Sequence, residues 1–242
     1  MNTANLPEAS EKAGTVRRMF GAIAPRYDLL NHLLSLNTDR AWRRRAVNAL
    51  LRDRTPTGRF LDLCAGTFDL ALELARRPGF DGIVIGSDFA LPMLRHGTPK
   101  TRGRPVLPAC SDALRLPFPD GSFDGAMVAF GVRNLADLDA GLREAARVLR
   151  PGARLVVLEF TVPQWQPFRA AYLAYFRHVL PWIGRFVSRH ASAYAYLPAS
   201  VLDFPTTAVL AARMEKAGLR DVRWHTLSGG IAAVHVGVRA RP

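Results

Sequence analysis

The segment that most constrains the fold of this chain is a strand-to-helix turn at residues 59–69, which reads RFLDLCAGTFD. Its apolar run ends abruptly in small residues, and a helical pattern of leucines and alanines starts at Asp69. Two arginines, a proline and a glycine end that helix at residues 76–79. A turn of small residues between a buried strand and a helix N-terminus allows a ligand to approach the backbone closely.

Asp88 ends the next strand-like run, residues 82–88, at about the 20-residue spacing typical of a carboxylate that binds a ribose. The turn alone is compatible with an ordinary tight connection, but together with Asp88 it indicates a nucleoside-bearing cofactor. A dinucleotide site requires the pattern G-x-G-x-x-G, and only Gly66 is present here. The pattern therefore favours a cofactor without phosphates, such as S-adenosylmethionine, which needs less of an anion-binding cradle.

Strands and helices alternate from Arg59 onward, which predicts a parallel sheet covered on both faces. The expected strands are 59–64, 82–88, 105–110, 124–130 and 154–160. Two final strands, 221–227 and 231–238, are separated only by Ser228-Gly229-Gly230 and should pair antiparallel. The predicted fold class is α/β, a doubly wound and mostly parallel sheet with an antiparallel edge feature.

The residues before the first expected strand form a region of their own. We expect a flexible tail at residues 1–14 and a single domain at 15–242, which starts with an N-terminal helical cover at 15–55. In that cover a helix is expected from Thr38 or Asp39, with the arginines 43–45 largely on its outer face.

Residues 163–205 interrupt the alternation with an apolar and aromatic stripe among basic residues, and Pro181 should break its helix. This insertion fits a lid over an apolar substrate, a membrane-surface element or ordinary helix packing onto the sheet.

The charge balance is basic, with 33 Lys and Arg against 20 Asp and Glu in 242 residues, a net charge of +13. Nucleic acid, an anionic membrane or an acidic substrate could match it, but the arginines are scattered, which favours a compositional bias and, next, membrane contact. Neither Cys64 nor Cys110 has a partner at metal-ligand spacing, so no metal site is predicted. The tail lacks an apolar signal core, and no uncharged run reaches the ~18 residues of a membrane span. We expect a cytoplasmic protein, and a peripheral position at the inner face of the membrane is left open.

Several blocks of sequence are together similar to the ubiquinone/menaquinone C-methyltransferases, a family of class I S-adenosylmethionine-dependent methyltransferases. Asp112-Ala113 and the segments 116–120 and 122–124 resemble the region that meets the adenine ring in these enzymes. The blocks that resemble the family more specifically are 19–20, 24–31, 34–36, 130–134, 147–152, 155–160, 196–200 and 228–235. The resemblance covers roughly residues 15–238.

This resemblance implies a seven-stranded Rossmann-like sheet with an antiparallel last strand. It also implies S-adenosyl-L-methionine as cofactor and transfer of its methyl group to a ring carbon of a polyprenyl quinol, in menaquinone (demethylmenaquinol to menaquinol) or ubiquinone biosynthesis. A ring carbon is a weak nucleophile until the neighbouring phenol ionises, so the site must help to remove that proton. No nucleic-acid partner is expected, since no aromatic-basic recognition stripe is present, and a homo-oligomer is left open.

Carried over residue by residue, the resemblance implies that Gly66 and Thr67 hold the methionine part of the cofactor, with Asp62 beneath. Asp88 would bind the ribose, and Asp112 and Ala113 the adenine.

Arg133, Asn134 and Tyr27 are the implied catalytic residues. Arg133 would stabilise a phenolate or orient a water, because a guanidinium is not a base at neutral pH. Tyr27 would close over the ring or hydrogen-bond its oxygen. A strand-end salt bridge and a turn residue are the structural alternative for Arg133 and Asn134.

Phe68 departs from the family pattern, which has glycine at this position of the turn. A phenyl side chain adopts positive φ only at a cost, so it should occupy cofactor space or point into the core with the turn shifted. Phe68 is the sole support for an alternative function, a non-catalytic methyltransferase-fold protein that binds lipid or acts in assembly.

Overall fold

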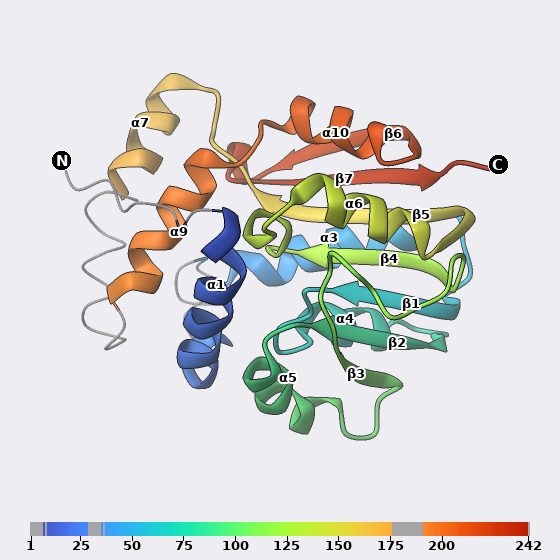
Figure 1. Cartoon of the computed structure of the whole chain (residues 1–242). Helices are drawn as coiled ribbons and strands as arrows, with labels where there is room; N and C mark the ends of the chain where they lie inside the picture. Colours follow the sequence, from blue (N-terminus) through green and yellow to red (C-terminus); the bar gives the residue numbers. More distant parts are fainter. Residues whose placement is uncertain (1–6, 8, 29–34, 36, 176–190, 242) are drawn as a thin grey trace.

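A sheet of seven strands runs through the centre of the molecule (Figure 1). The computed structural model describes residues 7, 9–28, 35, 37–175 and 191–241. The strands are β1 (Thr57–Leu63), β2 (Asp81–Asp88), β3 (Val106–Cys110), β4 (Phe123–Ala129), β5 (Leu149–Phe160), β6 (Leu219–Leu227) and β7 (Ala232–Arg239). Their order is β3-β2-β1-β4-β5-β7-β6, with β7 antiparallel to both of its neighbours and the other pairs parallel. The predicted doubly wound sheet with an antiparallel hairpin is confirmed.

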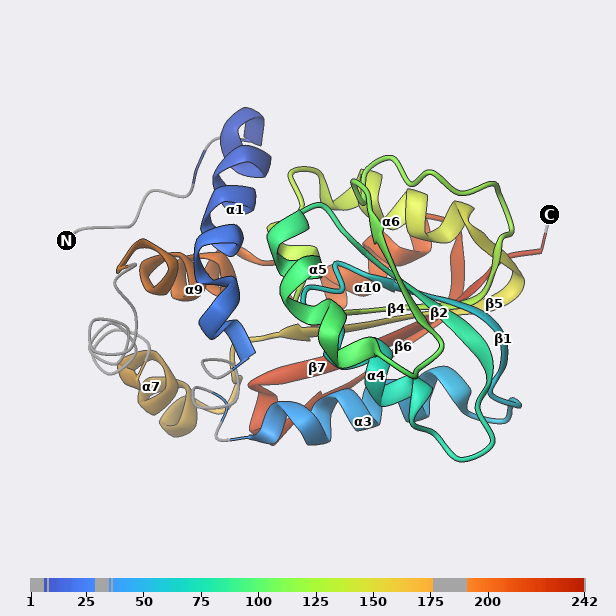
Figure 2. The same cartoon turned by 90° about the horizontal axis from the view of Figure 1, so that it is seen from below.

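Helices cover both faces of the sheet, and each face has its own apolar core. The helices α3 (Thr38–Leu51) and α4 (Asp69–Ala75) lie on one side, and α6 (Leu138–Arg147) and α10 (Thr207–Lys216) lie on the other (Figure 2). The central strands are apolar on both faces because both are covered; residues 155–158 of β5 are fully buried. Thr206 caps α10 by accepting the backbone N–H of Val209.

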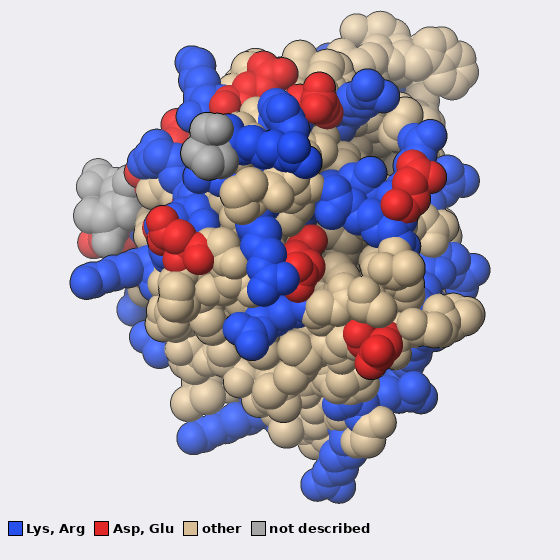
Figure 3. Space-filling model, turned by 90° about the vertical axis from the view of Figure 1, so that its right-hand side faces the viewer, with Lys and Arg blue, Asp and Glu red and all other residues tan. Residues whose placement is uncertain are grey.

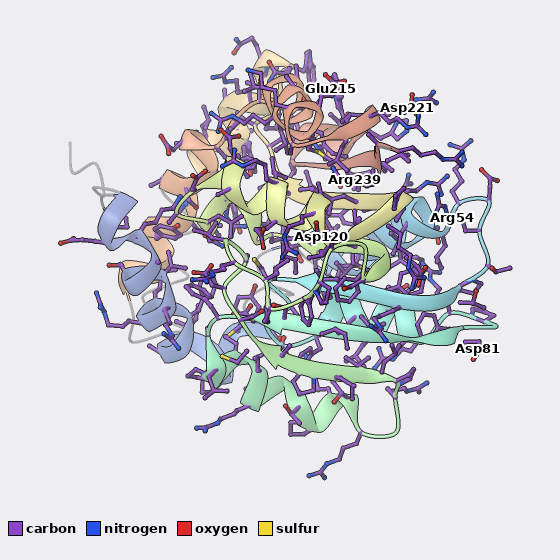
Figure 4. The ribbon with its side chains drawn as sticks, turned by 45° about the vertical axis from the view of Figure 1, so that its right-hand side comes forward. Arg54, Asp81, Asp120, Glu215, Asp221 and Arg239 are labelled. Atoms are coloured by element: carbon purple, nitrogen blue, oxygen red, sulfur yellow. The ribbon has the colours of Figure 1, made fainter. Side chains whose placement is uncertain are left out.

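Three further helices lie beyond the carboxyl ends of the parallel strands: α1 (Ala9–Ile23), α7 (Gln166–Ala174) and α9 (Ala191–Asp203), on the left of Figure 1. The short elements are α5 (Leu91–Gly97) and the 3-10 segments η1 (Ala24–Arg26), η2 (Thr98–Thr101), η3 (Val132–Asn134) and η5 (Ser228–Gly230). The opposite edge, where the parallel strands begin, bears charged side chains such as those of Arg54, Asp81 and Arg239 (Figure 4). A ligand is therefore expected to bind at the carboxyl ends of the parallel strands.

The N-terminal region differs from its prediction at the start of α1, at the cap of α3 and at Arg43. The helix α1 starts at Ala9, so the expected tail at residues 1–14 is wrong for its last six positions. The helix α3 packs on the sheet against β4, β5 and β7. Its N-cap is Asn37, not Thr38 or Asp39. Arg43 is 6% exposed and not on an outer face, because it pairs with Asp39 one turn earlier in the same helix.

The strand β5 starts at Leu149, five residues before its predicted start. Leu149 pairs with Phe123 ahead of a register shift in β4, and both side chains are buried. Arg150-Pro151-Gly152, a pattern typical of the end of a helix, therefore lies inside an irregular strand start.

The insertion at 163–205 contributes α7 and α9 to the described structure, and Pro181 lies outside the described residues. No helix among the described residues is long and apolar enough to cross a membrane. The molecular face in Figure 3 carries Lys and Arg dispersed among Asp and Glu, in agreement with a basic composition that is spread over the surface.

His235 in β7 gives a pH-dependent contribution to stability. It is 1% exposed, and its Nε2 lies 3.0 Å from the carbonyl oxygen of Thr207, which can only accept, so Nε2 carries the proton. Burial lowers the pKa of His235 to about 4. In the unfolded chain a histidine titrates near ~6.5. The unfolded state thus binds an extra proton between these values, and this contribution to stability is lost as the pH falls from about 6.5 to about 4.

We predict that replacing His235 with Gln makes stability less sensitive to acid. The difference in unfolding free energy between pH 7 and pH 5 should be smaller by about 2 kcal/mol in the variant. Urea denaturation of both proteins at the two pH values measures it. An equal pH dependence in the two proteins would mean that His235 is already charged in the fold.

Candidate active site

A pocket opens at the carboxyl ends of β1, β2 and β4, where the chain order of the strands reverses direction between β1 and β4. Ligands of open α/β sheets bind at such switch points. One side of the pocket is apolar and comes from α1 and the segments that follow β2 and β4. The lining residues are Ala13, Val16, Phe20, Tyr27, Cys64, Gly66, Ser87, Asp88, Phe89, Met93, Ser111, Asp112, Ala113, Leu114, Ala129, Phe130, Gly131, Asn134, Leu135 and Ala136.

Asp88 is held in the pocket wall by the backbone. Its Oδ2 accepts the N–H of Gly66 at 2.9 Å, and its Oδ1 accepts the N–H of Ala90 at 2.8 Å. Burial raises the pKa of Asp88, and the backbone N–H groups act against this rise. Each carboxylate oxygen can accept a second hydrogen bond, so Asp88 can also receive hydroxyl groups of a ligand.

Asp62 and Thr67 lie behind the turn and do not line the pocket. Asp62 is 1% exposed and accepts the N–H of Ala71 in α4 at 2.9 Å. Burial raises the pKa of Asp62 to about 8. The hydroxyl of Thr67 donates to Asp28 of the N-terminal region. Both residues therefore hold the strand-to-helix turn in place from the side that faces away from the pocket.

The remaining predicted cofactor residues come together on the other rim of the pocket. Asp112 and Ala113 follow β3 and line it, and Oδ1 of Asp112 accepts the N–H of Leu114 at 2.9 Å. Next to them the hydroxyls of Ser87 and Ser111 share a hydrogen bond across β2 and β3. These groups offer polar contacts on one rim of an otherwise apolar pocket.

Tyr27 and Asn134 both line the pocket. The ring of Tyr27 packs edge-on against Phe20, with centroids 5.8 Å apart. Asn134 donates its Nδ2 to the carbonyl of Phe130 at 3.3 Å, which fixes the orientation of its amide. Its Oδ1 is buried and has no hydrogen-bond partner among the described residues. Asn134 thus lines the pocket and has a buried acceptor without a partner among the described residues.

Arg133 does not line this pocket, although its neighbour Asn134 does. Its guanidinium forms an ion pair with Glu159 at 2.8 Å, in which the two side chains are 8% and 1% exposed. It lies 5.4 Å from the centre of the Phe160 ring and lines an adjacent polar pocket between α1, η3 and α9. Its Nε is buried without an acceptor among the described residues. The strand-end salt bridge that the sequence left as an alternative is therefore present.

Phe68 stays out of the pocket and adopts the backbone conformation that glycine would have. Its φ is 69° and ψ 19°, and its side chain is 0% exposed in the core between β2 and α5. The left-handed conformation costs roughly 1–2 kcal/mol, and burial of the phenyl ring contributes about 1.5–3 kcal/mol in return. The expectation that the ring points into the core is therefore confirmed, the expectation of a ring in cofactor space is wrong, and the non-catalytic alternative loses its support.

The core makes room for the Phe68 ring at two glycines. A Cβ on Gly86 of β2 would lie 2.5 Å from the ring, and one on Gly97 of α5 would lie 2.7 Å from it. The space for the Phe68 ring is therefore provided by β2 and α5 and not by the turn itself.

Sequence reasoning missed the apolar lining from α1, Ser87 and Ser111, and two charged residues, Glu159 and Lys100, that hold predicted site residues. The helical stripe that contains Val16 and Phe20 could have indicated the lining. No sequence signal pointed to Lys100.

The pocket fits S-adenosylmethionine by the chemistry of its lining. A carboxylate with open acceptor positions, a glycine at φ 54° without a side chain over the turn, and a mostly apolar wall suit a ribose, an amino-acid chain and an adenine. Together with the strand order, these features define a class I S-adenosylmethionine-dependent methyltransferase.

Comparison with known proteins gives the family: the chain belongs to the ubiE/COQ5 methyltransferase family, which it matches over residues 8–239. It is 51% identical to a demethylmenaquinone methyltransferase of Thermus thermophilus, across 91% of this chain and 100% of the relative. It is 46% identical to a ubiquinone/menaquinone biosynthesis C-methyltransferase of a Geobacter species, across 95% and 98%. Among solved structures, a methyltransferase of Thermotoga maritima has the same fold, with a TM-score of 0.64, 20% identity, and coverage of 92% of this chain and 98% of that one.

We predict that Gly86→Ala destabilises the protein by about 1–3 kcal/mol through overpacking against Phe68, and that Phe68→Ala rescues part of that loss. A double-mutant cycle in urea measures the coupling. Gly97→Ala is the matched control, because its Cβ would also lie 2.7 Å from the Thr67 backbone, which Phe68→Ala leaves in place. Strictly additive effects of Gly86→Ala and Phe68→Ala would contradict the packing described.

Proposed function

We propose that the protein methylates a ring carbon of a polyprenyl quinol, with demethylmenaquinol as the substrate. The names of the relatives that cover nearly the whole chain support this substrate class. The observation that carries it is that two neighbours in sequence have buried polar groups without partners among the described residues, the Nε–H donor of Arg133 and the Oδ1 acceptor of Asn134. A phenol offers both a proton to such an acceptor and an oxygen to such a donor.

The apolar wall of the pocket supports an aromatic substrate. Val16 and Phe20 of α1 and Leu135 after η3 line it with carbon atoms, and Val16 is 1% exposed. When bound, S-adenosylmethionine supplies an electrophilic methyl group on a sulfonium. A wall that excludes water destabilises the positively charged sulfonium before its methyl group is transferred. The same wall protects a phenolate from protonation.

The proposed cofactor contacts follow the residue types in the pocket. Asp88 receives the ribose hydroxyls, and Asp112 with the Ala113 backbone holds the adenine. Gly66 leaves space for the methionine part, while Thr67 and Asp62 keep the turn in shape from behind. Asp62 thus acts by holding the backbone of Ala71 in α4, and not by contact with the cofactor.

The catalytic proposal divides the work between two neighbouring residues. Asn134, which lines the pocket, accepts the phenolic O–H and orients the ring. Arg133, which lines the adjacent polar pocket, stabilises the phenolate through its positive charge. Glu159 holds the guanidinium in place, and the Nε–H of Arg133 has no acceptor among the described residues. Arg133 cannot take the proton, so a water in the adjacent polar pocket carries it away.

Tyr27 completes the proposed arrangement as a cover. Its ring lies on the same side of the pocket as Phe20 and close to Gly66, where a Cβ would be 3.7 Å from Tyr27 Cε1. The ring of Tyr27 therefore limits the space above the turn and orients the ligand that binds there.

Methyl transfer from labelled S-adenosylmethionine to a short-chain demethylmenaquinol tests the proposed function. We predict transfer to demethylmenaquinol and none to the matching menaquinol, in which the ring carbon is already substituted. Absence of transfer to demethylmenaquinol, in a protein that binds the cofactor, would contradict the substrate class.

We predict that Arg133→Ala lowers kcat about 100-fold or more, while the cofactor Kd changes less than threefold. Cofactor calorimetry and the transfer assay measure the two effects. The single variant leaves the Glu159 carboxylate buried without its cation, which destabilises the fold. Arg133→Ala with Glu159→Gln is therefore the companion variant, and full turnover in it would remove Arg133 from the mechanism.

We also infer that the side of the molecule formed by α7 and α9 meets the membrane surface, where a polyprenyl substrate resides. Trp165 precedes α7 and is 70% exposed, and Leu202 of α9 is 51% exposed. An exposed tryptophan beside basic residues such as Arg169 is suited to the headgroup region of a bilayer.

We predict that Trp165→Ser weakens co-sedimentation with vesicles that contain anionic lipid by about threefold or more. Trp224→Ser is the matched control, because Trp224 is 40% exposed but lies on the edge strand β6, away from α7. Equal losses in the two variants, or none in either, would contradict docking through α7.

A further inference from the structure

A network of charged and polar side chains ties the N-terminal region to the turn of the pocket. Lys100, in η2, donates to Asp28 Oδ2 and to Asp69 Oδ1, both at 2.7 Å. The other oxygen of Asp28 accepts the hydroxyl of Thr67. Asp69 in turn lies 3.7 Å from the buried guanidinium of Arg43. Four segments that are distant in sequence thus meet around one ammonium group.

Lys100 is the group that makes this arrangement possible. The two carboxylates approach the same nitrogen, so without its charge they would face each other and repel. The side chains of Lys100, Asp28 and Asp69 are 31%, 26% and 23% exposed, so water screens their interactions only in part. An ion pair at such a site contributes more than one on the open surface.

The position of Asp28 determines that of Tyr27, its neighbour in sequence. Tyr27 donates its backbone N–H to the carbonyl of Ala24, which closes η1. Its ring lines the pocket next to Gly66, while the hydroxyl of Thr67, the next residue of the turn, binds Asp28. A displacement of Asp28 therefore moves both the cover and one support of the turn.

We propose that Lys100 is a positioning residue for cofactor binding, because it clamps Asp28 to Asp69 and so holds Tyr27 over the pocket. Lys100 itself does not line the pocket and makes no contact with the reacting atoms. Its effect falls on the affinity for S-adenosylmethionine and much less on turnover at saturating cofactor.

The test compares Lys100→Met with Lys216→Met, which removes the same charge from an exposed position on α10. Calorimetry with S-adenosylmethionine should give a Kd about tenfold higher for Lys100→Met and unchanged for Lys216→Met. Saturating cofactor should restore kcat to within about threefold. Lys100→Arg should keep most of the affinity, since it retains the charge. An unchanged Kd in Lys100→Met would overturn the proposal.

A second variant distinguishes clamping from general damage to η2. Adding Asp28→Asn to Lys100→Met removes the repulsion between the carboxylates and leaves an oxygen for Thr67, so the double variant should bind the cofactor at least as well as the single one. A further loss of affinity in the double variant would overturn the proposed role.

Hydrogen exchange of the amides of residues 20–28, measured without cofactor, tests the clamp independently of any methyl transfer. It should be faster in Lys100→Met than in Lys216→Met. Unchanged exchange would overturn the clamp, whereas failure to methylate demethylmenaquinol with normal exchange would count only against the proposed substrate.

Discussion

Asp88 Oδ2 accepts the backbone N–H of Gly66 at 2.9 Å, and this bond joins the turn after β1 to the end of β2. The turn needs such support because three of its residues have left-handed backbones, with φ of 55° at Cys64, 54° at Gly66 and 69° at Phe68. Two of them are not glycine, and such conformations persist only where the surroundings fix them. The pocket, its carboxylate and the start of α4 all take their positions from this bend.

Sequence patterns predict the sheet well because they depend on local rules. The alternation of apolar runs and helical stripes identifies all seven strands, and the short Ser-Gly-Gly link correctly gives an antiparallel hairpin. The spacing from Gly66 to Asp88 brings these two residues into direct contact, as expected from adjacent parallel strands. Asp112, Ala113, Tyr27 and Asn134 also come to the pocket that the resemblance implies.

What the sequence could not supply are contacts between charges that are distant in the chain. Three consecutive arginines at 43–45 look like a solvated helix face, but Arg43 is buried next to Asp69 of α4 as well as Asp39 of its own helix. In the same way a role is predicted for Arg133, but none for its distant partner Glu159 in β5. Pair formation depends on the three-dimensional path of the chain, which periodicity does not encode. Much of the positive charge of this molecule nevertheless remains on its surface (Figure 3).

The accommodation of Phe68 has a consequence for how this turn can vary. Its ring occupies the volume that side chains at positions 86 and 97 would take. A glycine at 68 would free the space beside position 86, and the vacated core would then favour a larger residue on β2, whereas the Thr67 backbone would still exclude a side chain at position 97. Positions 68 and 86 thus form one steric unit, so a chimaera that exchanges this turn between relatives must carry Gly86 along with the phenylalanine.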